Sequence, residues 1–273
     1  YGSGKEILER LRWADGRFHS LNVDMIFNFP SQTPEMVLAD VEHIVESGAN
    51  QATFYPLMIS PAVKRSLKER VGTVSATHER EYYELICDAL DGRFEPGSAW
   101  TFSRVGGGMI DEYIVDYEDY VGVGSGSFSY LDGSIYVNTF SLRGYEEAID
   151  EGRTAADAVR SFGRRERMAY RLMMDLFGLE LDKRAFEASF GVTPERGLTA
   201  EVTFLRAAGA FDRDDAEVFT LTPKGRYLLV AMMREFFAGV NAFRDQVRAA
   251  LPEDERELLF GDGDTCSVVP TTT

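Results

Sequence analysis

Hydrophobic and polar residues alternate most clearly along residues 21–27, which read LNVDMIF. One face of this segment carries Leu21, Val23, Met25 and Phe27, and the other carries Asn22, Asp24 and Ile26. Successive side chains of a strand point to opposite faces, so the alternation predicts a β-strand with one apolar and one partly polar face. Such a strand suits a βα barrel, where the apolar face packs on helices and the polar face points toward a ligand.

A helix and a second strand follow at the spacing of a βαβ unit. Thr33 is a good N-cap, Pro34 fits the first helical turn, and Gly48 is a natural C-terminal stop. Between them an apolar stripe recurs at helical spacing, at Val37, Val41, Ile44 and Val45. Residues 52–57 then predict another strand. Because strands joined through a helix run parallel with a right-handed crossover, residues 21–57 predict one unit of an α/β sheet.

The next part of the chain mixes helical, aromatic and glycine-rich segments. The spacing of apolar residues predicts a helix over residues 77–91 and a strand over residues 99–103. Further on, Gly122, Gly124 and Gly126 alternate within an aromatic-rich stretch. This spacing allows the backbone to approach a neighbour or a ligand closely. It is not a dinucleotide fingerprint, because no strand and helix flank it in the required order.

The composition changes near residue 145, and helical patterns dominate from there. Residues 145–180 predict helices, first at residues 145–152 and then at residues 162–177. Residues 182–224 predict short helices and then a β-hairpin, with its turn region at residues 211–215 and its returning strand at residues 218–221. Helices with one small hairpin are typical of a winged-helix-like domain.

The charge and the cysteine usage limit the classes of partner and compartment. The chain has 273 residues and a net charge of −16, which opposes binding to nucleic acid and to anionic membranes. No apolar run reaches the roughly 18 residues of a membrane span. Cys87 and Cys266 are too far apart to suggest a zinc site or a disulfide framework. We therefore expect a cytoplasmic protein in a reducing compartment, with no nucleic-acid or membrane partner.

Two segments together resemble one protein family. Residues 23–33, VDMIFNFPSQT, are similar to the DLIxGLPxQT strand and loop of the oxygen-independent coproporphyrinogen III oxidase-like radical S-adenosylmethionine (SAM) proteins. Residues 120–130, YVGVGSGSFSY, with Tyr136 and Asn138 after them, look like that family's GxGxxAxS segment and trailing YxN. Each motif alone is weakly specific, whereas their order and spacing, across about residues 1–240, are specific together.

The resemblance implies an α/β fold, a cofactor set and a reaction. Residues 1–145 would be the C-terminal part of a partial βα barrel of the radical SAM type, residues 146–250 a small helical, winged-helix-like domain, and residues 251–273 an acidic, flexible tail. The implied cofactors are SAM and a 4Fe-4S cluster. The implied reaction is the oxidative decarboxylation of coproporphyrinogen III propionates to vinyl groups in haem biosynthesis. The implied partners are a tetrapyrrole substrate and an electron donor protein.

The chain departs from the family pattern at three places. The loop glycine is Asn28 here, and asparagine tolerates left-handed backbone better than most residues. Phe128 stands where relatives often have histidine or isoleucine. The family's CxxxCxxC segment is absent, and two isolated cysteines cannot replace three closely spaced thiolates. We expect an incomplete chain, inactive by itself, with the cluster ligands upstream; the alternative is a protein that naturally lacks the cluster.

The resemblance assigns five candidate cofactor-binding residues, which are Asp24, Asn28, Gln32, Pro56 and Phe128. Asp24 matches a SAM-contact position, where a carboxylate can accept hydrogen bonds from a ribose or an amine; pairing with a nearby arginine is the alternative. Pro56 and Phe128 match further contact positions and would pack around the adenosyl group or belong to the core. Asn28 and Gln32 would bind ligand or close the loop, and loop closure is the expectation for Gln32. The assignment requires Asp24 and Phe128 to converge on one cavity.

Arg104 is the candidate substrate-binding residue. It follows the predicted strand at residues 99–103, and a guanidinium pairs well with a propionate carboxylate. A surface ion pair is the alternative. Tyrosines between residues 113 and 136 would line a tetrapyrrole pocket or form core. No catalytic residue and no metal ligand is assigned.

Other functions stay open on the sequence. Haem-utilisation proteins and radical SAM methyltransferases share this architecture, and loops rather than the fold set the substrate. A haem or porphyrin carrier without the cluster is a further alternative. A DNA-binding winged helix is disfavoured, because the hairpin carries Asp212, Asp214 and Asp215 where phosphate contact needs a basic face.

Overall fold

The structure, a computed structural model, describes residues 3–59, 72–106 and 118–260. Its N-terminal part contains, in chain order, α1 (Gly4–Ala14), β1 (Asn22–Phe27), α2 (Pro34–Glu46), β2 (Gln51–Pro56), α4 (Ala76–Leu90), β3 (Phe94–Pro96) and β4 (Thr101–Arg104). The strands form a sheet in the order β1-β2-β4-β3, with β1 and β2 parallel and β4 antiparallel to β2 and β3. The predicted parallel strand–helix–strand unit is confirmed. The described sheet is mixed and open, and the partial barrel stays a prediction.

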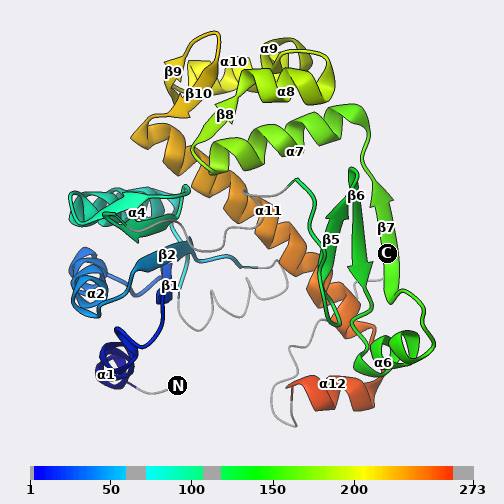
Figure 1. Ribbon diagram of the computed structural model, residues 1–273. Coiled ribbons are helices and arrows are strands. Elements are labelled where there is room, and N and C mark those ends of the chain that lie inside the picture. The colour runs from blue at the N-terminus through cyan, green and yellow to red at the C-terminus, as the bar shows by residue number, and fades with distance from the viewer. Residues whose placement is uncertain (1–2, 60–71, 107–117, 261–273) are drawn as a thin grey trace.

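Local chemistry explains why the β1–α2–β2 unit forms. On β1 the residues facing the core are Val23, Met25 and Phe27, and the exposed ones are Asn22, Asp24 and Ile26, as the alternation predicts. The Thr33 side chain caps α2 by accepting a hydrogen bond from the Met36 backbone N–H at 3.3 Å. Figure 1 shows α2 and α4 on the same side of β1 and β2, so helices cover the apolar face of the strands.

The second sheet is antiparallel, and the sequence predicted none of its strands. Its elements are β5 (Phe128–Leu131), β6 (Ser134–Asn138), α6 (Leu142–Asp150) and β7 (Ala156–Ser161), with the strand order β5-β6-β7. The helices predicted at residues 145–152 and 162–177 are confirmed by α6 and by the helix at Arg164–Phe177, and β7 lies between them, where no strand was predicted. Residues 157–161 are exposed and carry no apolar stripe, so pairing with β6 makes this segment a strand.

The C-terminal part consists of helices around a small antiparallel sheet. Its elements are α7 (Arg164–Phe177), β8 (Glu180–Asp182), α8 (Lys183–Phe190), α9 (Pro194–Gly197), α10 (Thr199–Ala207), β9 (Phe211–Asp214), β10 (Val218–Leu221), α11 (Pro223–Ala249) and α12 (Glu253–Phe260). In the sheet, ordered β8-β10-β9, β10 confirms the predicted returning strand. The turn predicted at residues 211–215 is wrong, because residues 211–214 form β9 and the chain reverses at residues 215–217.

Two further predictions concern the ends of this part. Residues 253–260 form α12, which differs from the flexible tail predicted for residues 251–273. Residues 261–273, with Cys266, lie outside the described residues. The winged-helix assignment and the boundaries near residues 145 and 250 stay predictions.

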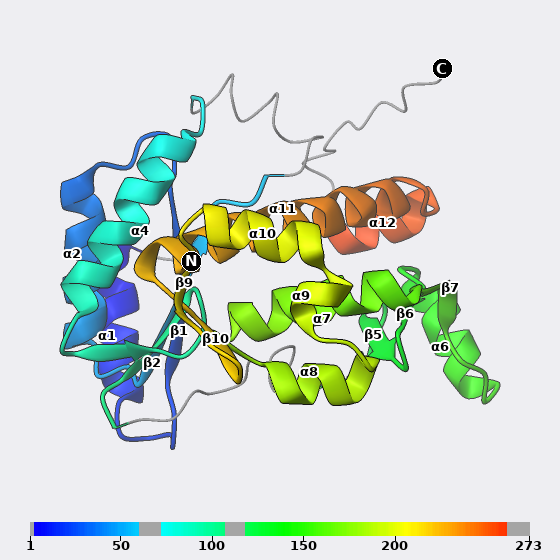
Figure 2. The same ribbon diagram turned by 90° about the horizontal axis from the view of Figure 1, so that it is seen from above.

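The long helix α11 connects the two ends of the molecule. It has 27 residues, and at about 1.5 Å per residue it is roughly 40 Å long. In Figure 1 it runs between the N-terminal sheet and the β5-β6-β7 sheet. Figure 2 shows α1, α2 and α4 at one end of the molecule and α6 with the β5-β6-β7 sheet at the other. None of the described helices, α11 included, combines the length and the apolarity that crossing a membrane requires.

One hydrophobic core crosses the predicted domain boundary. The fully buried Trp100 precedes β4, and its ring centroid lies 4.7 Å from that of Phe177 on α7 and 5.8 Å from that of Phe237 on α11. The Ala99 backbone N–H also donates to the Phe177 carbonyl at 2.8 Å. Buried residues of the N-terminal sheet and of α7 to α11 belong to a single cluster. The two predicted domains therefore pack as one body.

Candidate cofactor and ligand sites

β1, β2 and the residue after β1 supply three of the five candidate cofactor-binding residues. Asp24 is exposed on the open face of β1, where its carboxylate accepts a hydrogen bond from Asn22 Nδ2 at 2.9 Å. Pro56 is buried at the end of β2, opposite Phe27 in the strand register. Asn28 follows β1 directly. The parallel pairing thus brings the carboxyl ends of both strands together, which is the edge where α/β sheets bind ligands.

Asn28 and Gln32 shape the loop between β1 and α2. Asn28 has a φ of 71°, which confirms that this asparagine supplies the left-handed turn. Its backbone N–H donates to Gln32 Oε1 at 2.7 Å, and the Gln32 carbonyl accepts a hydrogen bond from the Tyr82 hydroxyl at 2.6 Å. Gln32 therefore closes the loop, as expected. Cofactor contact by either residue stays a prediction.

Phe128 lies in a different sheet from Asp24. It begins β5, and its ring centroid is 6.1 Å from that of Phe243 on α11, with the Arg244 guanidinium 5.3 Å above the ring. β1 and β5 lie apart in both overall views (Figures 1 and 2). Neither Asp24 nor Phe128 lines either of the two cavities described below. The convergence of Asp24 and Phe128 on one cavity stays a prediction.

Arg104 stabilises the end of a helix. Its Nε donates to the Ala49 carbonyl at 3.1 Å and its Nη2 to the Val45 carbonyl at 3.0 Å, and its guanidinium carbon lies 4.8 Å from the Phe94 ring centroid. The last carbonyls of a helix have no partner within the helix and carry partial negative charge, so a guanidinium satisfies them. These contacts account for the position of Arg104 without a ligand. Its substrate-binding role stays a prediction.

The glycine-rich segment approaches its own neighbouring strand. A Cβ atom on Gly122 would lie 2.3 Å from the Phe128 carbonyl oxygen, so only glycine fits there. The Gly122 backbone N–H donates to Ser129 Oγ at 3.1 Å. The close approach predicted from the spacing is therefore confirmed, and its partner is β5. Among the predicted pocket tyrosines, Tyr113 and Tyr117 lie outside the described residues.

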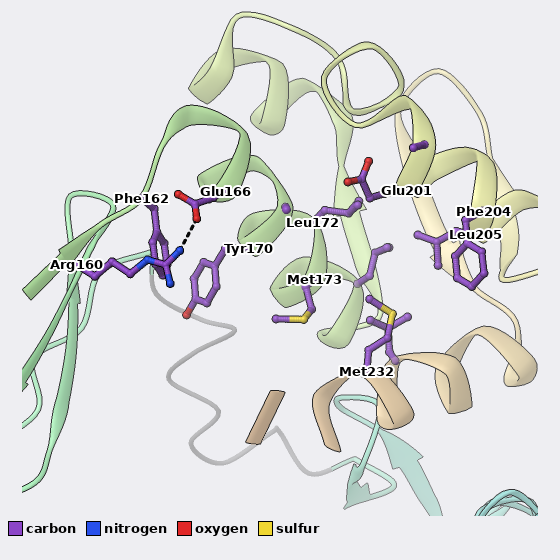
Figure 3. A pocket seen from close by; sticks show the side chains of 14 residues that line it. Arg160, Phe162, Glu166, Tyr170, Leu172, Met173, Glu201, Phe204, Leu205 and Met232 are labelled. Atoms are coloured by element: carbon purple, nitrogen blue, oxygen red, sulfur yellow. Dashed lines mark hydrogen bonds and ion pairs between the residues drawn. The ribbon is translucent and has the colours of Figure 1, made fainter. Parts of the chain in front are cut away.

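The sequence did not predict an apolar cavity of about 640 Å³ between α7, α10 and α11, at the end of β7 (Figure 3). Its lining residues are Arg160, Phe162, Glu166, Ala169, Tyr170, Leu172, Met173, Leu176, Ala200, Glu201, Phe204, Leu205, Leu229 and Met232. Phe204 and Met232 are 57% and 37% exposed, so the cavity presents apolar side chains to solvent. Arg160 pairs with Glu166 at 2.7 Å on the side of the cavity near β7.

A signal for this cavity exists in the pattern of α7. One stripe of the helix, Ala169, Leu172, Met173 and Leu176, lines the cavity, and the helix also buries Met174 and Phe177 outside that stripe. A surface helix with one covered face needs only a single apolar stripe, so the wider apolar surface of α7 indicates a second contact. Periodicity alone cannot say whether that second contact is protein or ligand.

A second, smaller cavity of about 160 Å³ lies on the far side of Tyr170 and is polar. Arg171 crosses it and pairs with Glu118 and, at 2.8 Å, with Asp175. Burial raises the pKa of Asp175 above its ordinary value, although the neighbouring Arg171 opposes that shift. Since its charges already pair with one another, this cavity offers less to a ligand than the apolar one.

The described residues do not fit an iron–sulfur cluster. Cys87 is a half-buried thiol on α4 that packs against the core, and burial raises its pKa. A 4Fe-4S cluster needs several thiolates close together. Across residues 3–59, 72–106 and 118–260, no three histidine, cysteine or acidic side chains are grouped to hold a metal. No chemical step is therefore assigned to a cluster held by these residues.

Known proteins that are similar to this chain are of the kind that the motifs resemble. No protein-family model matches the chain. The chain is similar to the heme chaperone HemW of Lactococcus lactis subsp. lactis (strain IL1403), at 29% identity over 148 residues, 52% of this chain and 38% of that protein. Heme chaperone HemW of Bacillus subtilis (strain 168) is 23% identical over 141 residues, 49% of this chain and 37% of that protein. The matches span less than two fifths of the length of these relatives.

A solved structure shares the fold. Coproporphyrinogen III oxidase (HemN) from Escherichia coli, described as a radical SAM enzyme, superposes with a TM-score of 0.65 at 18% sequence identity. The likeness covers 87% of this chain and 60% of that one. It establishes a mixed α/β fold common to both chains.

Proposed function

We propose that this chain, which resembles the oxygen-independent coproporphyrinogen III oxidase-like radical SAM family in its motifs and its fold, binds a tetrapyrrole in the apolar cavity between α7, α10 and α11. The observation that carries the proposal is the cavity itself. Its volume of about 640 Å³ lies in the range that holds a drug-sized or cofactor-sized ligand. Three aromatic rings, from Phe162, Tyr170 and Phe204, suit a flat, apolar macrocycle.

The cavity also offers groups for the polar parts of such a ligand. Arg160 is 69% exposed in its side chain and forms an ion pair with Glu166 that contributes little when exposed to water, so its guanidinium can turn to a propionate carboxylate. Met173 and Met232 bring thioether sulfur into the lining, and thioethers are among the axial ligands of haem iron. Together these groups favour haem as the occupant.

Two functions within the family fit a bound tetrapyrrole. Haem handling is favoured, because the curated relatives that match the sequence are heme chaperones. Oxidative decarboxylation of coproporphyrinogen is the second candidate, supported by the fold shared with the oxidase from Escherichia coli, and it would need an electron donor protein. Under either function the proposed contacts to SAM stay Asp24, Asn28, Gln32, Pro56 and Phe128.

A titration with two tetrapyrroles tests the proposal. The chain is titrated with haem and, separately, with metal-free coproporphyrin III, and binding is followed by the change in the visible absorption band. Ala200→Trp places an indole in the cavity, whereas Ala207→Trp places the same side chain on an exposed position of α10 outside the lining. Haem should bind the wild type and the Ala207→Trp variant alike, and at least roughly tenfold more weakly to Ala200→Trp.

The outcomes distinguish whether the chain binds a tetrapyrrole from where the tetrapyrrole binds. Failure of the wild type to bind either tetrapyrrole would rule out the proposed function. Tight haem binding that Ala200→Trp leaves unchanged would place the ligand elsewhere. Binding of coproporphyrin but not of haem would favour the oxidase over the haem-handling function.

A further inference from the structure

The carboxylate of Glu79 is completely buried where α4, α11 and the loop after β1 meet. Its Oε1 accepts hydrogen bonds from Arg234 Nη1 and, at 3.2 Å, from the Tyr227 hydroxyl. Its Oε2 accepts a hydrogen bond from Asn28 Nδ2 at 3.4 Å. A carboxylate in this position is stable only when it is both paired and hydrogen-bonded. The Glu79 carboxylate on α4 therefore connects the loop after β1 to α11, although the three segments are far apart in the sequence.

The Asn28 side chain contributes a link that the turn does not need. The related motif has glycine at this position, and glycine adopts a φ of 71° more easily than asparagine does. The amide is what asparagine adds: it donates to the Ser75 carbonyl at 3.2 Å and to Glu79. The backbone conformation and the link to Glu79 are thus separable by one substitution.

The partner of Glu79 on α11, Arg234, lies close in sequence to residues that line the apolar cavity. Arg234, which is 21% exposed in its side chain, pairs with Glu79, and Leu229 and Met232 line the cavity from the same helix. Nine residues after Arg234, Phe243 contacts the ring of Phe128. A helix moves as a rigid unit over a few turns, so a displacement of α11 acts on all of these contacts together.

Two partners of Glu79, Tyr227 and Arg234, keep their protons at neutral pH. Burial and the neighbouring Glu79 charge raise the pKa of Tyr227 to about 12, so its hydroxyl stays a donor. Burial opposes the charge of Arg234, but the hydrogen bonds and charges of Glu79 and Glu235 together outweigh burial and raise the pKa of Arg234. Tyr227 and Arg234 therefore both stay hydrogen-bond donors to Glu79 at neutral pH.

We propose that Glu79 and Arg234 are positioning residues for the loop at residues 28–32, acting through the Asn28 side chain and coupling the loop to α11. The proposal deepens the proposed function, because this loop carries two of the proposed SAM contacts and α11 lines the proposed tetrapyrrole cavity. It adds a set of contacts through which a change in the packing of α11 would alter the position of the loop at residues 28–32.

Amide hydrogen exchange at residues 28–32, measured by mass spectrometry on the full chain, tests the coupling without any ligand. Asn28→Gly keeps the left-handed backbone and removes the amide, and Arg234→Met removes the charge partner of Glu79. Each should speed exchange at residues 28–32 by roughly tenfold. The double variant should be no faster than the faster single variant, because both substitutions break the same link. Arg234→Lys should restore much of the protection.

Arg80→Met is the matched control. Arg80 neighbours Glu79 on α4 but pairs with the exposed Glu84, so exchange at residues 28–32 should stay at the wild-type rate. Unchanged exchange in Asn28→Gly, or strictly multiplicative effects in the double variant, would overturn the coupling. If Arg234→Met does not fold, the single variants Asn28→Gly and Arg234→Lys still decide the matter. This measurement needs no ligand. A failure to bind haem would therefore refute the proposed function and leave the coupling between the loop and α11 untouched.

A second readout separates positioning from general stability. Haem bound to the wild type should slow exchange at residues 28–32, and it should slow it less in Asn28→Gly although haem binds both chains equally. Equal slowing in both chains would show that the loop senses α11 by another route and would overturn the proposal.

Discussion

Gly122→Ala tests the close approach of the Gly122 backbone to β5. The added methyl group would lie 2.3 Å from the Phe128 carbonyl oxygen, 2.8 Å from its carbonyl carbon and 2.9 Å from its backbone nitrogen. All three atoms belong to the backbone of β5, which is held by β6, so no side-chain rotation relieves the clash. Residues 120–122 or β5 must move, and the hydrogen bond from the Gly122 N–H to Ser129 Oγ is stretched or lost.

The expected loss is roughly 1–3 kcal/mol, the range for forcing extra atoms into a packed site. For a chain of this size the melting temperature should fall by about 2–10 °C in differential scanning calorimetry. Gly239→Ala is the control, because a Cβ at that position of α11 meets no atom within 4 Å. It should stabilise the chain by about 0.5–1 kcal/mol, since alanine is the better helix former. A Gly122→Ala variant that melts at or above the wild-type temperature would refute the described approach.

Two further predictions concern the charged cluster between α8, α9 and β9. Lys183→Met should lower the free energy of unfolding by about 1–3 kcal/mol in urea titration, because the side chain is 7% exposed and pairs with Glu195 at 2.7 Å and Asp214 at 3.2 Å; Arg206, which keeps Asp214 paired, limits the loss. An unchanged midpoint would show that the pairs contribute nothing. Acid should also destabilise the chain: the hydrogen bond from Arg206 lowers the pKa of Asp214 below its ordinary 3.8, so its contribution is full above about pH 5 and is lost as the pH falls through the lowered value. An unfolding midpoint that stays constant down to pH 3 would contradict this assignment.

Patterns confined to a few neighbouring residues predicted the structure well. The alternation on β1 identified the face that packs on helices, and Thr33 with Pro34 marked the start of α2. The departure from glycine at Asn28 predicted a residue with positive φ. In each case one residue type has a local physical reason to occupy its place, so the sequence alone is sufficient.

The failures share a dependence on distant partners. β7 has no apolar alternation and becomes a strand only because β6 pairs with it. Residues 211–214 contain two aspartates, which favour turns, yet Asp214 is accommodated in β9 by Lys183 and Arg206. The burial of Glu79 depends on Arg234, 155 residues away. No local pattern carries that information, and the apolar cavity was missed for the same reason.

Trp100 gives the molecule a property that neither of its halves has alone. Its indole comes from the N-terminal sheet, but its surroundings come from Phe177 and Phe237 of the C-terminal helices. Cutting the chain near residue 145 would expose the indole of Trp100 to water on one fragment. On the other fragment it would expose the rings of Phe177 and Phe237. The two halves should consequently unfold in one cooperative transition. A chimaera that takes one half from a homologue should fold only when the tryptophan and the two phenylalanines that surround it are both retained.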